Sequence, residues 1–369
     1  MKIAYDAKRA FLNSSGLGNY SRTIIKAMAH YYAEAQQFLF TPTVTSTPFY
    51  LEIKETKSIN IITSTTFYKS FWRSYQITHE LNKLKVDVYH GLSNELPVNI
   101  KNFKGKKIVT IHDLIFLRYP HLYSFFDRLI YHHKFYKACV NADVIIAISE
   151  ETKKDIIHFF NISASKIKVI YQSCDEAFYN AFSQKEIEIV KNSHQLPAKY
   201  LLYVGTIEER KNLVTIIKAL TLVRDIPLVV VGKKTKYFDV VEREIIKNKL
   251  QERVLFLNNV TNQELPVIYQ LASVFIYPSI FEGFGIPVLE ALVSKTPVIT
   301  NKNGCFPEAG GPNSVYIDVL NEAEMAQNIN AILNSASLHY KIAESGFVYA
   351  EKFQKAVIIK QLMEVYTTK

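Results

Sequence analysis

Two glutamates flank a glycine-rich turn late in the chain, and the residue types there suit an anionic ligand. Seven residues separate Glu282 from Glu290, among them Gly283 and Gly285. The glycines let the backbone approach a ligand closely, and Pro287 has the fixed φ that suits the first turn of a helix. The alternative is that both carboxylates only favour the helix dipole, which would account for Glu290 but not for the glycines.

The start of this helix would itself bind an anion. Backbone N–H groups in the first turn of a helix have no partner within the helix, and the helix dipole favours a negative charge beside them. In this segment those groups belong to Ile286, Val288 and Leu289. We expect them to converge on the same ligand.

A second segment places two cations before a helix. Arg210 and Lys211 precede Asn212, which we expect to cap a helix over Leu213–Leu222. Cations oppose the dipole at this end of a helix by about 0.3–1 kcal/mol each, and a bound anion would reverse that effect. Arginine offers phosphate oxygens two parallel hydrogen bonds and lysine offers a point charge. The alternative is a solvated basic turn, and the GxxxxGK[ST] pattern of a Walker loop is absent.

Two further segments follow predicted strands in the N-terminal half. Gly16-Leu17-Gly18 lies between the first strand and a helix over Tyr20–Tyr31. It is an incomplete glycine fingerprint that could cradle a phosphate or form a plain turn. His112 follows the strand Lys107–Ile111. There it would point to a ligand at the carboxyl end of the sheet, with packing in the core or on the surface as the alternative.

Length and composition suit a two-domain globular protein that binds an anion. The chain has 369 residues, 48% of them hydrophobic and 13% aromatic, and a formal net charge of +10. That charge fits nucleic acid, an anionic membrane or a nucleotide diphosphate. The three cysteines Cys139, Cys174 and Cys305 lack disulfide or metal-site spacing, and no DxD or HExxH occurs. No apolar run reaches the about 20 residues that span a bilayer, and the start lacks a secretory signal, so we expect a cytoplasmic protein.

Short apolar runs alternate with helical patterns along the whole chain. This alternation predicts an α/β fold with parallel sheets, whose strands are covered on both faces. The pattern breaks between Asp175 and Ala198 and then restarts, which predicts two Rossmann-like domains facing each other across a cleft. The predicted strands are Lys2–Tyr5, Asn60–Thr63, Val86–His90, Lys107–Ile111, Val144–Ala147, Lys168–Tyr171, Tyr200–Val204, Leu228–Val231, Val254–Leu257, Val274–Tyr277, Val298–Thr300 and Val315–Ile317.

Taken together, these motifs resemble those of glycosyltransferase family 4, whose members have the GT-B architecture. The resemblance covers essentially the whole chain, and the combination of the RKN loop with E-x7-E is its specific part. It implies an acceptor-binding domain over residues 1–175, a nucleotide-sugar-binding domain over 176–345 and a C-terminal helix within 346–369 that crosses back to the first domain. The segments that carry it are Gly16-Leu17-Gly18-Asn19-Tyr20, Thr110-Ile111-His112-Asp113, Gly205 with Arg210-Lys211-Asn212, Glu282 to Glu290, and Asn303-Gly304-Cys305-Phe306-Pro307-Glu308.

The resemblance also implies a role for each matching residue. Arg210 and Lys211 would bind the diphosphate, Glu290 the ribose, and Glu282 hydroxyls of the donor sugar. His112 would form a hydrogen bond to that sugar near the reacting centre, so His112 and Glu282 are the expected catalytic pair. The remaining donor-binding residues would be Gly18, Phe284, Gly285 and Ile286, with Asn258 and Val260 beside the base. The family often has glycine where this chain has Asn258.

Family members retain the configuration of the transferred sugar, with the leaving phosphate accepting the proton of the acceptor hydroxyl. Glu282 would then position the sugar and would not be a nucleophile like that of a retaining glycosidase. Arg210, Lys211 and helix N-termini would take the place of a metal ion in neutralising the diphosphate. We expect a hexose donor, mannose from GDP-mannose, with UDP- or dTDP-sugars as alternatives and no further cofactor. The expected acceptor is a saccharide or a lipid-linked sugar used for a cell-surface polysaccharide.

Aromatic and basic residues interleave in two segments of the N-terminal half, Leu117–Lys137 and Phe67–Arg73. Such a mixture suits the inner face of an anionic membrane, where a lipid-linked acceptor would lie. The alternative is an aromatic core seam with solvated Lys and Arg. The basic side chains that a membrane contact would use are Lys69, Arg73, Arg128 and Lys134.

Two rival functions come from other classes. An NAD-dependent oxidoreductase needs a complete glycine fingerprint and an acidic residue at the end of the second strand, whereas the stretch after Gly18 offers only Glu34 in a helical pattern. A catalytically silent binder of a sugar nucleotide or of nucleic acid would also suit the charge, but no RNP, KH or helix-turn-helix signature supports nucleic acid.

Overall fold

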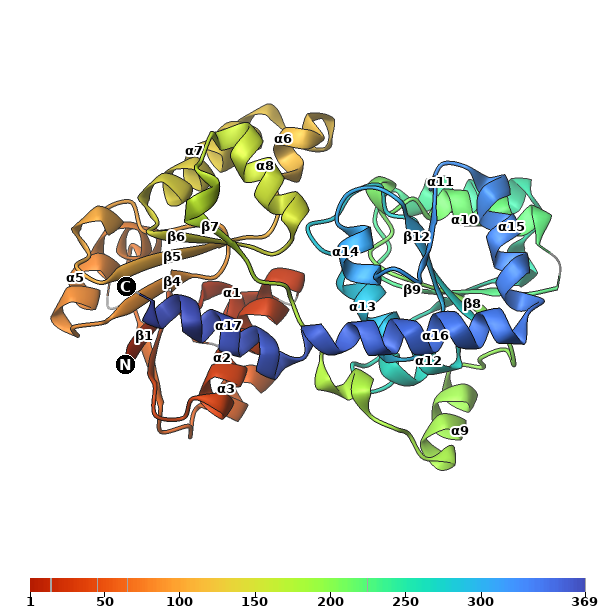
Figure 1. The fold of residues 1–369 in the computed structure, drawn as a ribbon, viewed down its shortest axis with the longest axis horizontal. Coiled ribbons are helices and arrows are strands. Elements are labelled where there is room, and N and C mark those ends of the chain that lie inside the picture. The colour runs from red at the N-terminus through yellow and green to blue at the C-terminus, as the bar shows by residue number, and fades with distance from the viewer. Residues whose placement is uncertain (14, 45, 65, 224, 369) are drawn as a thin grey trace. The chain divides into compact units, whose positions relative to one another are not determined.

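The chain folds into two compact units, each built on one sheet. The computed structural model describes residues 1–13, 15–44, 46–64, 66–223 and 225–368 (Figure 1). The first unit comprises Met1–Gln172 with Lys355–Lys369, and the second comprises Ser173–Gln354. The first boundary lies ahead of the break expected after Asp175, because Asp175 already lies near Glu290 of the second unit and helps to raise the pKa of that carboxyl.

The first unit holds a seven-stranded sheet in the order β3-β2-β1-β4-β5-β6-β7, and every neighbouring pair is parallel. Two helices, α2 and α17, cover one face, and α7 and α8 cover the other (Figure 1). The strand order reverses direction between β1 and β4, which makes a switch point where ligands bind in folds of this kind. The strands are β1 (Lys2–Asp6), β2 (Gln36–Thr41), β3 (Ile59–Thr63), β4 (Val88–Gly91), β5 (Lys106–Ile111), β6 (Val144–Ala147) and β7 (Ile167–Val169).

The helices of the first unit are mostly short. The longest are α2 and α7, and α17 comes from the C-terminal end of the chain. They are α1 (Lys8–Leu12), α2 (Gly16–Tyr31), α3 (Pro48–Ile53), α4 (Lys69–Phe71), the π-helical turn η1 (Trp72–Gln76), α5 (Ile77–Lys83), α6 (Ile115–Arg118), α7 (Phe125–Asn141), α8 (Glu150–Phe160) and α17 (Lys355–Thr367).

The second unit holds a six-stranded parallel sheet in the order β10-β9-β8-β11-β12-β13, with its switch point between β8 and β11. Its strands are β8 (Leu201–Val204), β9 (Leu228–Val231), β10 (Val254–Leu257), β11 (Val274–Tyr277), β12 (Val298–Asn301) and β13 (Val315–Ile317). Its helices are α9 (Gln184–Ser193), α10 (Leu213–Ala219), α11 (Phe238–Lys247), α12 (Leu265–Leu271), α13 (Ile286–Val293), α14 (Phe306–Gly310), α15 (Glu322–Leu333) and α16 (Ala336–Ala350).

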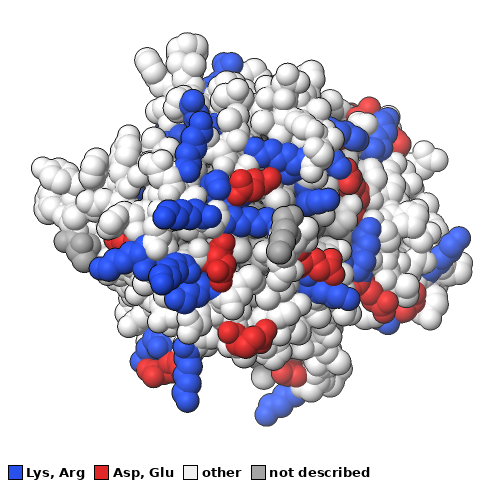
Figure 2. Space-filling view, turned by 60° about the vertical axis from the view of Figure 1, so that its left-hand side comes forward, with Lys and Arg blue, Asp and Glu red and all other residues white. Residues whose placement is uncertain are grey.

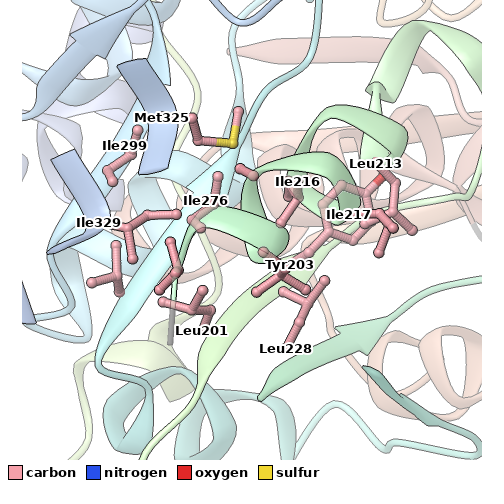
Figure 3. Close-up of a cluster of buried hydrophobic side chains, with 14 of the residues drawn as sticks. Leu201, Tyr203, Leu213, Ile216, Ile217, Leu228, Ile276, Ile299, Met325 and Ile329 are labelled. Carbon is pink, nitrogen blue, oxygen red and sulfur yellow. The ribbon is translucent and has the colours of Figure 1, made fainter. Parts of the chain in front are cut away.

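Apolar strands and amphipathic helices form the core of the second unit. Figure 3 shows side chains from β8, α10, β11 and α15 meeting in one cluster, with Tyr203, Ile216 and Ile276 fully buried. Burying an aliphatic or aromatic side chain of this size stabilises a fold by about 1.5–3 kcal/mol. This core therefore provides a rigid base for the loops at the carboxyl ends of β8 and β11.

Three expectations about the elements were wrong. The strand β2 was missed, because its apolar run, Phe38–Phe40, is short and follows two glutamines. One of these, Gln37, is nevertheless buried and donates to the Ile25 carbonyl. The helix α2 begins at Gly16 and not at Tyr20, so the glycines form its first turn. The expected boundary at residue 345 falls inside α16, where Gly346 lies close to Leu292 of α13.

Candidate functional site

The switch point of the second sheet brings two predicted segments together. Arg210 and Lys211 follow β8, Glu282 follows β11, and these two strands are neighbours. A short 3-10 turn, η6 (Glu209–Lys211), presents both cations. Residues 66 or more positions apart in sequence therefore meet because parallel neighbours end at the same edge of a sheet.

The carboxylate of Glu282 is the centre of this cluster. Its Oε1 atom lies 2.5 Å from Lys211 Nζ and 2.7 Å from Arg210 Nη1. The same oxygen accepts hydrogen bonds from the hydroxyls of Ser279 (2.7 Å) and Tyr277 (3.0 Å). Every partner of this carboxylate in the described part of the chain is on Oε1. Its second oxygen, Oε2, is therefore the one that can accept hydrogen bonds from a ligand.

The neighbouring cations fix the charge of Glu282. Burial alone would raise the pKa of the carboxyl, but Lys211 and Arg210 outweigh it and lower the pKa to about 2. Arg210 is held on its other side by Glu208, with Nη2 2.7 Å from Oε1, and by the carbonyl oxygen of Phe281. The cluster thus carries two positive charges around one negative charge, with the Glu208 carboxylate at its edge.

The glycine turn before α13 differs in one respect from expectation. Gly285 has a φ of +104°, which favours glycine, and it directly precedes the helix. The N–H groups of Val288 and Leu289 donate to the Gly285 carbonyl, at 2.9 and 3.4 Å. They therefore stabilise the turn, and of the three N–H groups expected to bind an anion only that of Ile286 does not bond within this turn.

Asn212 does not cap α10 in the expected way. Its backbone is left-handed, with a φ of +56°, and its side chain accepts no bond from a backbone N–H of the helix. The Oδ1 atom instead accepts from the Thr215 hydroxyl (2.8 Å), and Nδ2 donates to the Val319 carbonyl (2.8 Å). The side chain of Asn212 therefore ties the RKN turn to the core of the unit.

Glu290 lies on α13 in an environment unlike that of Glu282. Burial raises the pKa of its carboxyl to about 7, Asp175 acts in the same direction, and a hydrogen bond from the Tyr269 hydroxyl opposes them. That bond joins Tyr269 to Oε2 at 2.9 Å. The two glutamates of the E-x7-E segment therefore differ in charge near neutral pH, because only Glu282 has cations beside it.

The other expected donor-binding residues of this unit are distributed along the same sheet edge. Phe284 is buried with its ring 5.3 Å from that of Phe353, so only its backbone can meet a ligand. Asn258 and Val260 follow β10 in a loop in which Asn258 is exposed and Val260 half-buried. That loop lies two strands from β8.

In the first unit, His112 follows β5 and is held on both sides of its ring. Its Nε2 atom donates to the Leu92 carbonyl at 2.8 Å, and Nδ1 lies 3.4 Å from the side-chain amide of Gln172. The ring of Tyr20 packs edge-on against it, with centroids 4.7 Å apart. Burial lowers the pKa of His112 to about 4, and Arg9 acts in the same direction. The imidazole is therefore neutral, with its proton on Nε2.

The glycines at the start of α2 have different surroundings. A Cβ on Gly18 would lie 1.9 Å from the Asn13 carbonyl oxygen, whereas Gly16 has open space. The first backbone bond of the helix runs from Asn19 N to Ser15 O at 3.0 Å. Gly18 is therefore needed for the close approach of the preceding turn.

Two family models match the chain. A family model described as Glycosyltransferase Family 4 matches residues 14–178, and one described as Glycosyl transferases group 1 matches residues 184–347. The two models together match most of the chain. The chain belongs to glycosyltransferase family 4.

The relatives of this family 4 glycosyltransferase include bacterial sugar transferases. It is 26% identical to O-antigen chain mannosyltransferase B of Escherichia coli over 99% of each chain. It is 29% identical to O-antigen chain mannosyltransferase RfbU of Salmonella typhimurium, over 57% of this chain and 56% of that protein. The crystal structure of Anabaena HepE in complex with UDP and glucose has a TM-score of 0.78 at 18% identity, covering 99% of both chains. The two Rossmann-like units therefore constitute a GT-B fold.

Three residues that hold His112 of this glycosyltransferase were not singled out in the sequence. Besides Leu92 and Gln172, Asn94 accepts a bond from the His112 N–H at 2.8 Å and has a φ of +64°. The available signal was the Gly-Leu-Ser-Asn run directly after β4, which is typical of a turn at a strand end. Gln172 carried no such signal.

One basic residue of the predicted membrane face of this glycosyltransferase, Arg73, is half-buried and held in ion pairs. Arg73 pairs with Asp6 and, at 2.8 Å, with Glu95, so its charge is already balanced within the first unit. The physical reason is that Asp6, at the end of β1, is buried and needs a cation. Lys134 also reaches Glu95, at 3.4 Å.

Basic and acidic side chains are interspersed on the surface of this glycosyltransferase (Figure 2). Figure 2 shows Lys and Arg side chains gathered on one face with Asp and Glu side chains between them, in keeping with the net charge of +10. Within the described ranges, no three His, Cys, Asp or Glu side chains are grouped so that they could hold a metal ion. The described helices are each too short or too polar to cross a bilayer.

Proposed function

We propose that this glycosyltransferase transfers mannose from GDP-mannose, with retention of configuration and without a metal ion. The proposed acceptor is a saccharide or lipid-linked sugar of a cell-surface polysaccharide. The observation that carries the proposal is the pair of cations, Arg210 and Lys211, held around Glu282 at the switch point of the second sheet. The names of the O-antigen mannosyltransferase relatives support the choice of sugar and of polysaccharide.

The diphosphate of the donor binds to Arg210 and Lys211. Both side chains are paired with Glu282 in the free protein, so they are already oriented when the donor arrives. Charge-assisted hydrogen bonds to phosphate are about twice as strong as neutral ones, and two cations stabilise the charge that develops on the leaving phosphate. The N–H group of Ile286 adds a backbone contact to this phosphate or to the sugar.

Glu282 binds hydroxyls of the donor sugar through Oε2, since its Oε1 atom already accepts four hydrogen bonds or ion pairs. A carboxylate with a pKa of about 2 beside two cations is a weak base and a weak nucleophile. Glu282 is therefore a positioning group for the sugar. The acceptor hydroxyl attacks on the face from which the phosphate leaves, and the phosphate takes its proton.

His112 accepts a hydrogen bond from a hydroxyl of the donor sugar at Nδ1. Its Nε2 proton is committed to the Leu92 carbonyl, and the Gln172 contact at 3.4 Å is long enough to be exchanged for a sugar hydroxyl. The low pKa keeps the ring neutral, so Nδ1 remains an acceptor throughout the physiological pH range. Glu290, on α13, accepts from the ribose hydroxyls.

The deciding experiment measures thermal shifts of the purified protein with GDP, UDP, dTDP, their sugars and NAD, first in EDTA and then with added Mg²⁺. A ligand that binds only the folded state stabilises it by about 2.7 kcal/mol at a hundredfold excess over Kd. We expect GDP and GDP-mannose to respond, and the response to be lost in Arg210→Ala and Lys211→Ala. A matched control is Lys247→Ala, because Lys247 is an exposed lysine on α11 of the same unit.

Other outcomes each select an alternative. A response to UDP or dTDP alone would replace GDP-mannose by that donor and keep the transferase mechanism. A response to NAD, with none to any nucleotide sugar, would favour an oxidoreductase and overturn the proposal. A response that requires added Mg²⁺ would overturn metal independence alone.

A membrane contact is part of the proposal and rests on exposed aromatic side chains of the first unit. Phe125 and Phe126 at the start of α7 are 63% and 75% exposed. The segment Phe67–Phe71 surrounds a hollow of about 750 Å³, with Phe67 92% exposed. Aromatic side chains beside Lys69 and Arg128 suit the interface of an anionic bilayer.

Vesicle sedimentation tests this contact. Phe125→Ala with Phe126→Ala should reduce binding to phosphatidylglycerol vesicles, whereas Tyr340→Ala, which removes an exposed ring of the second unit, should not. Equal binding of all variants to the vesicles would contradict the proposed membrane contact and leave the proposed transferase reaction unchanged.

A further inference from the structure

A chain of buried hydrogen bonds runs from the C-terminal helix to the surroundings of His112. The Tyr366 hydroxyl, on α17, is bonded to His90 Nδ1 at 2.7 Å. His90 Nε2 is bonded to Thr110 Oγ1 at 2.8 Å, and Thr110 Oγ1 to the Tyr20 hydroxyl at 3.1 Å. The ring of Tyr20 in turn packs edge-on against His112.

Side chains along β5 point alternately to its two faces, which explains why this series of hydrogen bonds leads to His112. Side chains two residues apart lie on the same face of a strand. Thr110 and His112 therefore share a face with Ile108, which belongs to the core under α2 and α17. Val109 and Ile111 face the opposite core, under α7 and α8. Thus α17 covers the face of β5 that carries His112 at its end.

The polar groups that form this hydrogen-bond series are buried in an otherwise apolar core. His90 and Thr110 have no exposed surface, and Tyr366 is 3% exposed. Burial lowers the pKa of His90 to about 3, so its imidazole is neutral and can accept at one nitrogen while donating at the other. A buried polar group costs about 1–3 kcal/mol when it loses its partner, so each member holds the next in place.

The end of α17 is itself anchored to β5. Lys106, the first residue of β5, donates through Nζ to the carbonyl oxygens of Val365 (2.6 Å) and Thr368 (2.5 Å). The first residue of β5 therefore holds the last turn of α17, and the last residue of β5 directly precedes His112. This double attachment sets the position of the Tyr366 hydroxyl relative to His90.

We propose that Tyr366 is a positioning residue for His112, acting through His90, Thr110 and Tyr20. The proposal rests on the role proposed above for His112. Edge-to-face rings prefer a defined orientation, and the Thr110 bond fixes that of Tyr20. Loss of the Tyr366 hydroxyl frees His90 to rotate, and the disturbance reaches the imidazole through Thr110 and Tyr20.

Two conservative substitutions with matched controls test the proposal. Tyr366→Phe removes one hydroxyl and keeps the ring, and Tyr200→Phe removes a buried tyrosine hydroxyl that bonds to the Ile268 carbonyl (2.6 Å) in the other unit. Thr110→Val removes Oγ1, and Thr78→Val removes a buried threonine bond to Asn99 (2.7 Å) away from His112. The assay is GDP release from GDP-mannose in water, together with the Kd for GDP.

We expect kcat to fall about tenfold in Tyr366→Phe and in Thr110→Val, with the Kd for GDP within twofold of the original protein. Both controls should keep kcat within twofold. Because Tyr366 acts through His112, Tyr366→Phe should have no further effect in a His112→Ala background, whereas independent sites would add. Additive effects, or a kcat equal to that of the controls, would overturn the proposal.

A spectroscopic readout separates this proposal from the proposed function. In ¹H–¹³C spectra, the Cε1–Hε1 signal of His112, assigned from His112→Ala, should shift in Tyr366→Phe but not in Tyr200→Phe. An unmoved signal would refute the positioning role whether or not GDP-mannose is the donor. A His112→Ala variant with full activity would instead refute the role of His112 in the reaction.

Discussion

The ammonium group of Lys211 lies 2.5 Å from Oε1 of Glu282, so the principal cation and anion of the site are paired with each other before any ligand binds. This pairing explains how a buried carboxylate and a buried ammonium group coexist, since each supplies the countercharge that the other needs. It also means that a ligand phosphate must bind cations that already have a carboxylate partner.

Removing either cation should weaken donor binding more than it changes folding. Arg210→Ala or Lys211→Ala removes a charge-assisted hydrogen bond worth about 1.5–3 kcal/mol, so the Kd for the donor should rise roughly tenfold to a hundredfold. Isothermal titration of GDP is the measurement, with Lys247→Ala as the control. Unchanged affinity in both site variants would show that the diphosphate binds elsewhere.

Acid should destabilise the second unit through Glu282. The folded pKa of about 2 lies below the ordinary value near 4.3, so the folded state holds its proton less tightly than the unfolded state. The stabilisation is complete above the ordinary pKa and is lost as the pH falls through the folded one. Urea unfolding between pH 5 and pH 2.5 should show a smaller loss of stability in Glu282→Gln. If the free energy of unfolding fell equally with acid in the original protein and in Glu282→Gln, the pairing of Glu282 with the cations would be contradicted.

Glu290 should make donor binding depend on pH near neutrality. Its folded pKa of about 7 lies above the ordinary value, so folding is favoured by the protonated form and loses stability as the pH rises from about 4.3 to 7. The hydrogen bonds that Glu290 accepts from the ribose hydroxyls favour the ionised form of its carboxyl group. GDP-mannose has no phosphate that titrates in this range, so its Kd should fall about tenfold between pH 6 and pH 8, as the ionised fraction of Glu290 rises. Glu290→Gln should bind with the same affinity at both pH values.

The two glycines of α2 should respond oppositely to alanine. A Cβ at position 18 would lie 1.9 Å from the Asn13 carbonyl oxygen, whereas a Cβ at position 16 meets nothing within 4 Å. Gly18→Ala should therefore lower stability by about 1–3 kcal/mol, as overpacking does. Gly16→Ala should be neutral or stabilising by up to about 1 kcal/mol, because alanine favours a helix. Thermal unfolding measures both, and equal Tm values would contradict the close approach at Gly18.

The strands of the second sheet could be predicted closely because their signal is local. Leu228–Val231, Val254–Leu257 and Val274–Tyr277 are short apolar runs and match the observed bounds. The strand Gln36–Thr41 was missed, since its first two residues are polar and only the tertiary structure buries Gln37. Burial of a polar residue depends on a partner elsewhere, here the Ile25 carbonyl, which no local pattern indicates.

The candidate site was predictable in its residue types but not in its contacts. Arg210, Lys211 and Glu282 carried a signal because cations before a helix and glycines beside a carboxylate are unusual choices. That four groups share one oxygen of Glu282 became visible only once β8 and β11 were neighbours. The ion pairs of Arg73 were likewise not predictable, because its sequence neighbours are aromatic while its partners Asp6 and Glu95 are distant in sequence.

The sequence by itself determined the parallel α/β class, the strand ends that bear the candidate residues and the family, since these depend on local apolar patterns and short motifs. Only the tertiary structure decided the protonation and pairing of those residues. Glu282 and Glu290 have the same side chain, yet two cations lower the pKa of one and burial raises that of the other. The electrostatic environment of a group is set by neighbours that the fold assembles from distant parts of the chain, as Tyr366 is brought to His90.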